Sequence, residues 1–204
     1  MQDMATSIDI SRKGARARPF AAFLGALRLD RGRVHEFCGP ARRTLALMAA
    51  RGDGATTGSP VLWISPGWAT DRLNPEGVLP FIAPGRLIFV LPKRPEDLLW
   101  VMEEALRSGA VALVVADLLA PPGLTPVRRL QLAAEAGAAS GPAPLGLILT
   151  PGNGGAQGVE SRWHLAPSHT AAATGWQLQR LRARMEPPRQ WALHQGPGGL
   201  QLAG

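Results

Sequence analysis

Five short apolar runs recur along the middle of the chain, and their pattern predicts the fold class. They lie at 33–38, 60–65, 86–91, 111–116 and 144–149. Each run is largely apolar rather than alternating, which indicates strands covered on both faces, as in a parallel sheet. We therefore expect a sheet whose central strands are mostly parallel.

The segments between these runs have the start and stop signals of helices. Pro95 stands at a first helical position, Glu96 follows in the first turn, and Gly109 comes after the last apolar position. A further helix is predicted from Thr125 to a stop at Gly137. Strands that alternate with helices predict an α/β fold with a mostly parallel sheet flanked by helices.

After Gly158 the pattern changes to alternation of apolar and polar residues. Trp or Leu recurs two positions apart at 163 and 165, 176 and 178, 191 and 193, and 200 and 202. This period predicts three or four antiparallel strands, with one buried face and arginines on the other. The connection from Thr150 to Gly158 is rich in Gly, Asn and Gln, and we expect it to be flexible.

These patterns predict one domain at 19–204, with a parallel α/β core at 33–150 and an antiparallel extension at 159–204. Residues 1–18 have little periodicity and are expected to form a flexible basic leader. The apolar segment at 20–27 is expected to form one or two turns of amphipathic helix against the core.

Charge and composition narrow the range of functions. The formal net charge is +7, and the excess of basic residues lies at the two ends of the chain, which favours an acidic partner such as nucleic acid or an acidic protein. Arginine outnumbers lysine 20 to 2, so the compositional bias of a GC-rich genome is an alternative explanation. No apolar run is long enough for a membrane span, and we expect a cytoplasmic protein.

Metal and thiol chemistry find little support in the sequence. The single cysteine, Cys38, excludes an internal disulfide and a cysteine-based zinc cluster, and its apolar strand indicates an inert core thiol. The four histidines show no ligand spacing. We expect no metal and no cofactor.

An incomplete phosphate loop is the main chemical signal. The turn runs from Gly39 to Thr44, between a predicted strand at 33–38 and a predicted helix. A nucleotide-binding loop needs the pattern G-x-x-x-x-G-K-[ST], in which glycine amides and a lysine contact the phosphates and a hydroxyl binds magnesium. Here the second glycine and the lysine are missing, so the site is degenerate.

Several phrases of the sequence resemble a known family. The segment 105–117, followed by 124–136, resembles a nucleotide-site strand of RecA recombinases and the segment after it, and 32–40 resembles the first such strand. Together with the shortened loop and the phrase at 160–167, they are similar to the ImuA family over roughly residues 30 to 203. The resemblance implies a RecA-like domain that acts as an accessory factor of damage-induced bacterial translesion synthesis.

Residue by residue, the resemblance carries over little of the RecA chemistry. Gly39 matches the first loop glycine and Thr44 falls near the magnesium-binding hydroxyl, but Arg42 or Arg43 stands in place of the lysine. Asp117 falls at the position of the magnesium-associated aspartate, although such a carboxylate is often only a helix cap or a surface acid. No glutamate follows the strand that ends at 64, so the resemblance implies a protein without ATP hydrolysis.

The resemblance also identifies segments that would contact DNA or partners. The first DNA loop has no room between 118 and 125, and the second corresponds to 151–158, where Asn153 and Gln157 are candidate contacts and an ordinary connection is the alternative. Trp68 follows a strand end and is a candidate partner anchor. The remaining candidates are the basic residues of the leader and of a predicted strand face, namely Arg12, Lys13, Arg16, Arg18, Arg180, Arg182 and Arg184.

The sequence thus leaves three functional hypotheses. The first is an interaction platform for an ImuB-type Y-family polymerase homologue and, through it, an error-prone C-family DNA polymerase, as the resemblance implies. The second is a divergent ATPase that uses Arg43, Thr44 and Asp117. The third is a module that binds single-stranded DNA or associates with RecA filaments through the basic ends of the chain.

Overall fold

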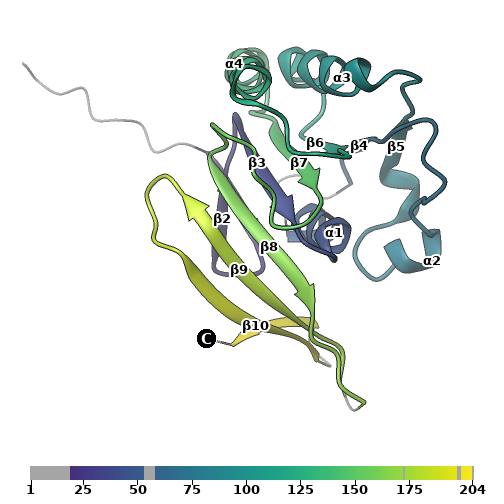
Figure 1. Ribbon diagram of the computed structural model, residues 1–204, viewed down its shortest axis with the longest axis vertical. Helices are drawn as coiled ribbons and strands as arrows, with labels where there is room; N and C mark the ends of the chain where they lie inside the picture. Colours follow the sequence, from purple (N-terminus) through teal and green to yellow (C-terminus); the bar gives the residue numbers. More distant parts are fainter. Residues whose placement is uncertain (1–18, 53–57, 172, 197–198, 204) are drawn as a thin grey trace, which may run out of the picture.

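One nine-stranded sheet organises the part of the chain that the computed structural model describes, residues 19–52, 58–171, 173–196 and 199–203 (Figure 1). The strand order is β11-β10-β9-β8-β3-β7-β6-β4-β5. The strands are β3 (Arg33–Cys38), β4 (Val61–Ile64), β5 (Leu87–Val90), β6 (Leu113–Asp117), β7 (Leu145–Thr150), β8 (Ser161–Pro167), β9 (Gly175–Ala183), β10 (Arg189–Gly196) and β11 (Gly199–Ala203). Pairing is parallel from β5 to β8 and antiparallel from β8 to β11.

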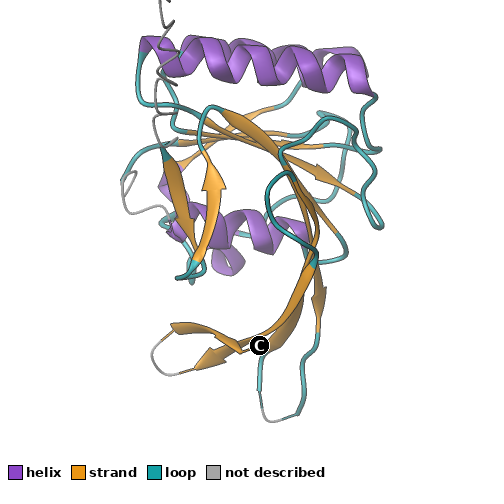
Figure 2. Ribbon diagram, turned by 90° about the vertical axis from the view of Figure 1, so that its left-hand side faces the viewer, coloured by secondary structure: helices purple, strands orange, loops and turns teal. Residues whose placement is uncertain are grey.

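Helices cover both faces of the parallel part. Helix α1 (Arg42–Gly52) packs on one face, and α3 (Pro95–Ser108) and α4 (Leu124–Ser140) pack on the other (Figure 2). A short helix, α2 (Pro75–Val78), and a 3₁₀ turn (Pro84–Arg86) connect β4 to β5. The predicted α/β class with a mostly parallel sheet and an antiparallel C-terminal region is confirmed.

The continuous apolar runs are explained by these two layers. Along β3, Val34 packs with the core under α3 and α4, whereas Phe37 packs with the core under α1. Along β7, Ile148 and Leu149 divide between the two cores in the same way. Both faces of each central strand are buried, so the sequence shows no polar alternation there.

Helix α4 runs past the predicted stop at Gly137. A Cβ at that position would lie 2.0 Å from the carbonyl oxygen of Leu106 in α3. The glycine is therefore required by the close approach of α3 and α4, and not by a helix end. A left-handed glycine cap does occur where it is predicted in α3, at Gly109, with φ of 64°.

The segment at 20–27 is not helical, so that prediction is wrong. It forms an antiparallel hairpin of β1 (Phe20–Phe23) and β2 (Leu27–Asp30). Ala21 and Phe23 are buried while Phe20 and Ala22 are exposed, which is the two-residue period of a strand. Leu24 and Gly25 form the tight turn with positive φ, and the short length of the strands concealed the period.

The predicted C-terminal strands are present as β8 to β11, with one difference in pairing. Strand β8 pairs in parallel with β3 and antiparallel with β9, so the antiparallel part of the sheet begins between β8 and β9. Trp163, Trp176 and Trp191 are buried on the face that continues the α1 side. The predicted extension is thus a continuation of the same sheet.

Candidate functional site

The turn after β3 places Gly39 directly against β8. Its φ is 92°, and a Cβ would lie 2.5 Å from the carbonyl oxygen of Leu165 and 2.7 Å from Nε2 of His164. The amide of Ala41 donates a hydrogen bond to the same Leu165 carbonyl at 3.1 Å. Backbone amides of such a turn bind phosphates when they are open, but here one of them is bonded to β8.

The two arginines that follow the turn surround Asp117, at the carboxyl end of β6. Arg43 Nε donates to Asp117 Oδ2 at 2.5 Å, and Arg42 Nε lies 3.5 Å from Asp117 Oδ1. The Asp117 side chain is only 5% exposed. Both of its oxygens therefore face guanidinium groups.

A second carboxylate completes this cluster. Arg43 also pairs with Asp71, in the segment after β4. Burial opposes the charge of Arg43, but the carboxylates of Asp117 and Asp71 outweigh this effect and raise the pKa of its guanidinium. The fold thus brings the predicted residues Arg42, Arg43 and Asp117 together, but they form ion pairs with one another and with Asp71.

Thr44 and the segment after β4 add no catalytic group to this cluster. Thr44 is half-buried in the first turn of α1. After β4, the amide of Ser65 donates to the Val90 carbonyl at 3.1 Å and that of Gly67 to the Pro92 carbonyl at 2.8 Å. This segment therefore continues the pairing with the chain of β5.

Trp68 lies beside an exposed apolar edge of the sheet. Among the described residues, strand β5 pairs only with β4, and its side chains Ile88 and Phe89 are 48% and 45% exposed. Leu91 and Trp68 are each 44% exposed, and Gly67, which precedes Trp68, bonds to the residue after Leu91. We call Trp68, Ile88, Phe89 and Leu91 the apolar edge.

The backbone of β5 is also available at this edge. The ladder to β4 uses the Val90 carbonyl, and in a parallel pair alternate residues bond to the same neighbour. The N–H and C=O groups of Phe89 and the C=O of Leu87 therefore point away from β4, whereas the Leu87 N–H already donates to the Pro84 carbonyl. The apolar edge combines these backbone groups with exposed apolar side chains.

The connection at 151–158 is held in place, so the expectation of a flexible loop is wrong. It crosses from the end of β7 to the start of β8 and thereby makes β8 parallel to β3. Asn153 and Gln157 are exposed, but Ala156 is buried and its amide donates to the Glu36 carboxylate at 3.1 Å. The Gly155 amide donates to the same carboxylate at 2.9 Å.

Glu36, in the centre of β3, anchors this crossover. It is fully buried and also accepts hydrogen bonds from Thr150 Oγ1 at 2.7 Å and from Arg162 Nε at 2.5 Å. A Cβ at Gly154 would lie 2.6 Å from Glu36 Oε1, which explains the glycine. Glu36 was not among the site residues predicted from the sequence, although a single acid within a buried strand was a usable signal.

The arginines of β9 do not share one face, contrary to the sequence prediction. The register of β8 and β9 shifts between Arg162 and Trp163. Arg180 therefore lies opposite Trp163, whereas Arg182 lies opposite the neighbouring residue, Arg162, on the other face of the sheet. Arg180 is buried, its guanidinium carbon lies 5.5 Å from the ring centres of both Trp163 and Trp191, and its Nε donates to the Pro187 carbonyl at 3.0 Å. Burial, reinforced by the nearby Arg189, lowers its pKa.

The remaining predicted basic residues differ in position. Arg182 and Arg184 are exposed, and Arg184 Nε lies 3.7 Å from Glu160 Oε1. The leader residues Arg12, Lys13, Arg16 and Arg18 lie outside the described residues.

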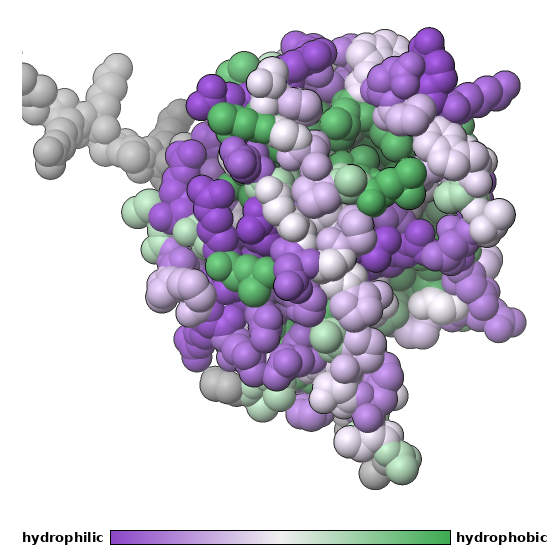
Figure 3. Space-filling view, viewed as in Figure 1, coloured by the Kyte–Doolittle hydropathy of each residue, from purple (hydrophilic) through white to green (hydrophobic). Residues whose placement is uncertain are grey.

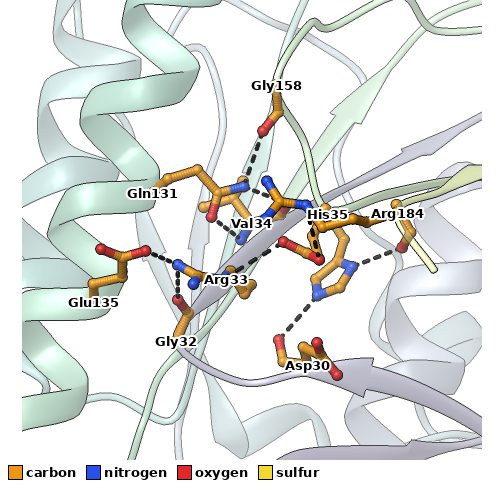
Figure 4. A network of polar contacts seen from close by, with 11 residues as sticks. Asp30, Gly32, Arg33, Val34, His35, Gln131, Glu135, Gly158 and Arg184 are labelled. Carbon is orange, nitrogen blue, oxygen red and sulfur yellow. Dashed lines mark hydrogen bonds and ion pairs between the residues drawn. The ribbon is translucent and has the colours of Figure 1, made fainter. Parts of the chain in front are cut away.

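A polar network at the opposite end of β3 joins the hairpin, α4 and β8 (Figure 4). The amide side chain of Gln131 accepts from the Val34 amide and donates to the carbonyls of Val34 and Gly158. Arg33 pairs with Glu135 and Glu160. These contacts fix the start of β3 against α4 and the crossover.

His35 is a buried titratable group of this network. Its Nε2 lies 3.0 Å from the Asp30 carbonyl and its Nδ1 lies 2.7 Å from Ser161 Oγ, which accepts from Trp163 Nε1 at 2.8 Å. A carbonyl only accepts, so we assign the proton to Nε2 and let the Ser161 hydroxyl donate to Nδ1. Burial lowers the pKa of His35, which favours this neutral form.

Comparisons with known proteins add no identification. The chain matches no protein-family model and has no significant match among curated proteins. Within the described ranges, no group of three or more His, Cys, Asp or Glu side chains is arranged to hold a metal ion. Among those residues, no helix is both long and apolar enough to span a bilayer.

Proposed function

We propose that this protein is a RecA-like accessory factor without ATP hydrolysis, similar to the ImuA family, and that it acts as an interaction platform in damage-induced translesion DNA synthesis. The ion pair between Arg43 and Asp117 is the observation that carries the proposal. It joins the first turn of α1 to the end of β6, at the carboxyl edge of the sheet, where α/β proteins bind ligands.

The geometry of this edge supports loss of nucleotide chemistry. A magnesium-associated aspartate needs an oxygen that faces a phosphate-bound cation, but the Asp117 oxygens face Arg43 and Arg42. The turn amide at Ala41 is bonded to Leu165. Opening the site would separate Arg43 from Asp117. Leaving one charge of a buried ion pair without its partner costs about 3 kcal/mol of stability.

The apolar edge supports the second part of the proposal, a platform for a protein partner. Unpaired backbone groups beside exposed apolar side chains suit an extended segment that adds to the sheet as a further strand. Arg86 precedes β5 and Lys93 follows it, whereas the next residue, Arg94, already pairs with Asp97. In an antiparallel pair of two copies these basic ends would oppose one another, so the charge favours a different protein whose strand has acidic residues at its ends.

By the resemblance, that partner is an ImuB-type Y-family polymerase homologue, which links the protein indirectly to an error-prone C-family DNA polymerase. The alternative of a divergent ATPase is tested by measuring ATP hydrolysis with the purified full chain and with Thr44→Ala and Asp117→Asn. We expect no hydrolysis above background in any of the three proteins. Hydrolysis by the unmodified chain that both substitutions abolish would refute the proposal.

A further inference from the structure

One face of the C-terminal strands is uncovered by helices. The sheet curls past α1, and no helix of the described chain lies on its outer side (Figure 2). The register places His164, Gln179 and Gln190 side by side on this face, and Gln177 and Arg182 on the same side of β9. With His194 of β10, these six residues define the open face.

The open face consists of polar side chains that alternate along the strands with buried apolar ones. Along β9 and β10 its residues alternate with Trp176, Leu178, Trp191 and Leu193, which are buried on the other side. Gln179 Nε2 donates to Gln190 Oε1 at 3.1 Å, so each amide retains further capacity to bond. In the space-filling view the lower part of the molecule, which includes these strands, is mainly hydrophilic (Figure 3). Such a surface suits a partner that brings hydrogen-bonding groups and not an apolar peptide.

The charge of this face selects the kind of partner. None of its six residues is acidic. Arg182 lies directly opposite Arg162, and like charges in this arrangement repel. Glu36 neutralises Arg162, but Arg182 has no ion-pair partner among the described residues. An anion bound at Arg182 would reduce the repulsion between Arg182 and Arg162.

The basic surface continues beyond the strand. A groove of about 390 Å³ lies between α4 and the end of β9, and Arg128 and Arg184 are on its walls. Arg128 is exposed and has no ion-pair partner within the described part of the chain. The acids of the groove, Glu135 and Glu160, already pair with Arg33, and Glu160 also lies 3.7 Å from Arg184 Nε. The groove therefore extends the cationic path that begins at Arg182.

We propose that the open face and this groove bind single-stranded nucleic acid. Arg182, Arg184 and Arg128 contact successive phosphates, and the amides of Gln177, Gln179 and Gln190 bond to base edges, which a single strand exposes. The six residues of the open face include no Trp, Tyr or Phe, and its two imidazoles, His164 and His194, are the only rings among them, so its affinity depends mainly on phosphate contacts and falls steeply with salt. This binding goes beyond the proposed platform and uses a different surface.

The test is fluorescence anisotropy of the full chain with a labelled single-stranded oligonucleotide of about 20 nucleotides. Parallel titrations with single-stranded DNA, single-stranded RNA and duplex DNA show which nucleic acid is bound. We expect binding to the single strands, with a slope of log K against log salt of about −2 for three phosphate contacts. Arg182→Gln should weaken binding about tenfold, the loss of one charge-assisted bond, and reduce the slope by about 0.7.

Lys93→Gln is the matched control, because it removes one exposed charge at the distant end of β5. It should change binding less than about twofold, and circular dichroism checks that both variants fold. Gln179→Ala with Gln190→Ala should weaken binding without changing the salt slope. No binding at low salt, equal losses in Arg182→Gln and Lys93→Gln, or tighter binding of duplex would overturn the assignment. None of these results alters the test of ATP hydrolysis.

Discussion

Arg43 in the first turn of α1 and Asp117 at the end of β6 are joined at 2.5 Å between Nε and Oδ2, across the edge where a nucleotide would bind. The carboxylate is nearly buried and the guanidinium side chain is 25% exposed. This ion pair links a helix to the centre of the sheet, and it also occupies two of the three groups, Arg43 and Asp117, from which a divergent ATPase would be built.

The coupling between these two residues is measurable. Arg43→Ala leaves Asp117 without its main partner in a buried position, so we expect the free energy of unfolding in urea to fall by about 3 kcal/mol. Asp117→Ala should cost a similar amount, and the double variant less than the sum. Arg42→Ala is the control, because its Nε lies at 3.5 Å, and it should cost less. Strictly additive losses would show that the pair does not stabilise the edge.

Glu36 is expected to control the crossover at 151–158. Glu36→Gln keeps the shape but removes the charge that Arg162 and the amides of Gly155 and Ala156 bind. We expect a loss of about 3 kcal/mol in stability and faster hydrogen exchange at those two amides. Asn153→Ala, an exposed change in the same crossover, is the matched control and should leave exchange unchanged. Equal protection in all three proteins would contradict the anchoring role.

The buried His35 predicts a loss of stability in mild acid. Burial, opposed in part by the Asp30 carbonyl and the Glu160 carboxylate, holds its pKa below the ordinary value of 6.5. Just below pH 6.5 the imidazole is protonated in the unfolded chain but still neutral in the folded chain, which favours unfolding. The contribution of neutral His35 to the free energy of unfolding is therefore complete above pH 6.5 and is lost as the pH falls towards the folded pKa. Unfolding in urea at a series of pH values measures this effect.

The control for this prediction is His35→Asn, which cannot titrate. Its free energy of unfolding should decrease less than that of the unmodified chain as the pH is lowered. His164, whose pKa burial also lowers, contributes equally to both proteins. The same pH dependence in the two proteins would reject the role assigned to His35.

The apolar edge predicts where a protein partner binds. Phe89→Asp places a charge beside the unpaired backbone of β5 and should weaken capture of the ImuB-type polymerase homologue at least about tenfold, since a charge buried in an interface is costly. Leu132→Asp is the matched control, because Leu132 is 65% exposed on α4, and it should leave capture unchanged. A partner that binds both variants equally well uses another surface.

Much of the fold follows from the sequence because burial on both faces leaves a clear pattern. The strands of the parallel core and the four C-terminal strands were predictable from periods that extend over whole elements. The hairpin of β1 and β2 was not, because four residues are too few to separate a strand from a helical turn. Gly137 resembles a helix end in sequence, and only the approach of α3 explains it.

The location of the candidate site was predictable from the sequence, but its ion pairs and backbone hydrogen bonds were not. Strand ends meet at one edge of a parallel sheet, so Gly39, Arg43 and Asp117 were expected near one another. The pairing with Asp71 and the bond from Ala41 to Leu165 depend on loop geometry that no periodic pattern encodes. Likewise, Glu36 stabilises the crossover through backbone amides, whose positions depend on the folded chain.

The most direct test of the proposed platform is the affinity of the full chain for the ImuB-type polymerase homologue, measured with and without millimolar ATP and magnesium. Because Arg43 and Asp117 satisfy each other, the protein should bind its partner with the same dissociation constant in both conditions. A partner affinity that changes with nucleotide, and does so only while Thr44 and Asp117 are intact, would contradict the account.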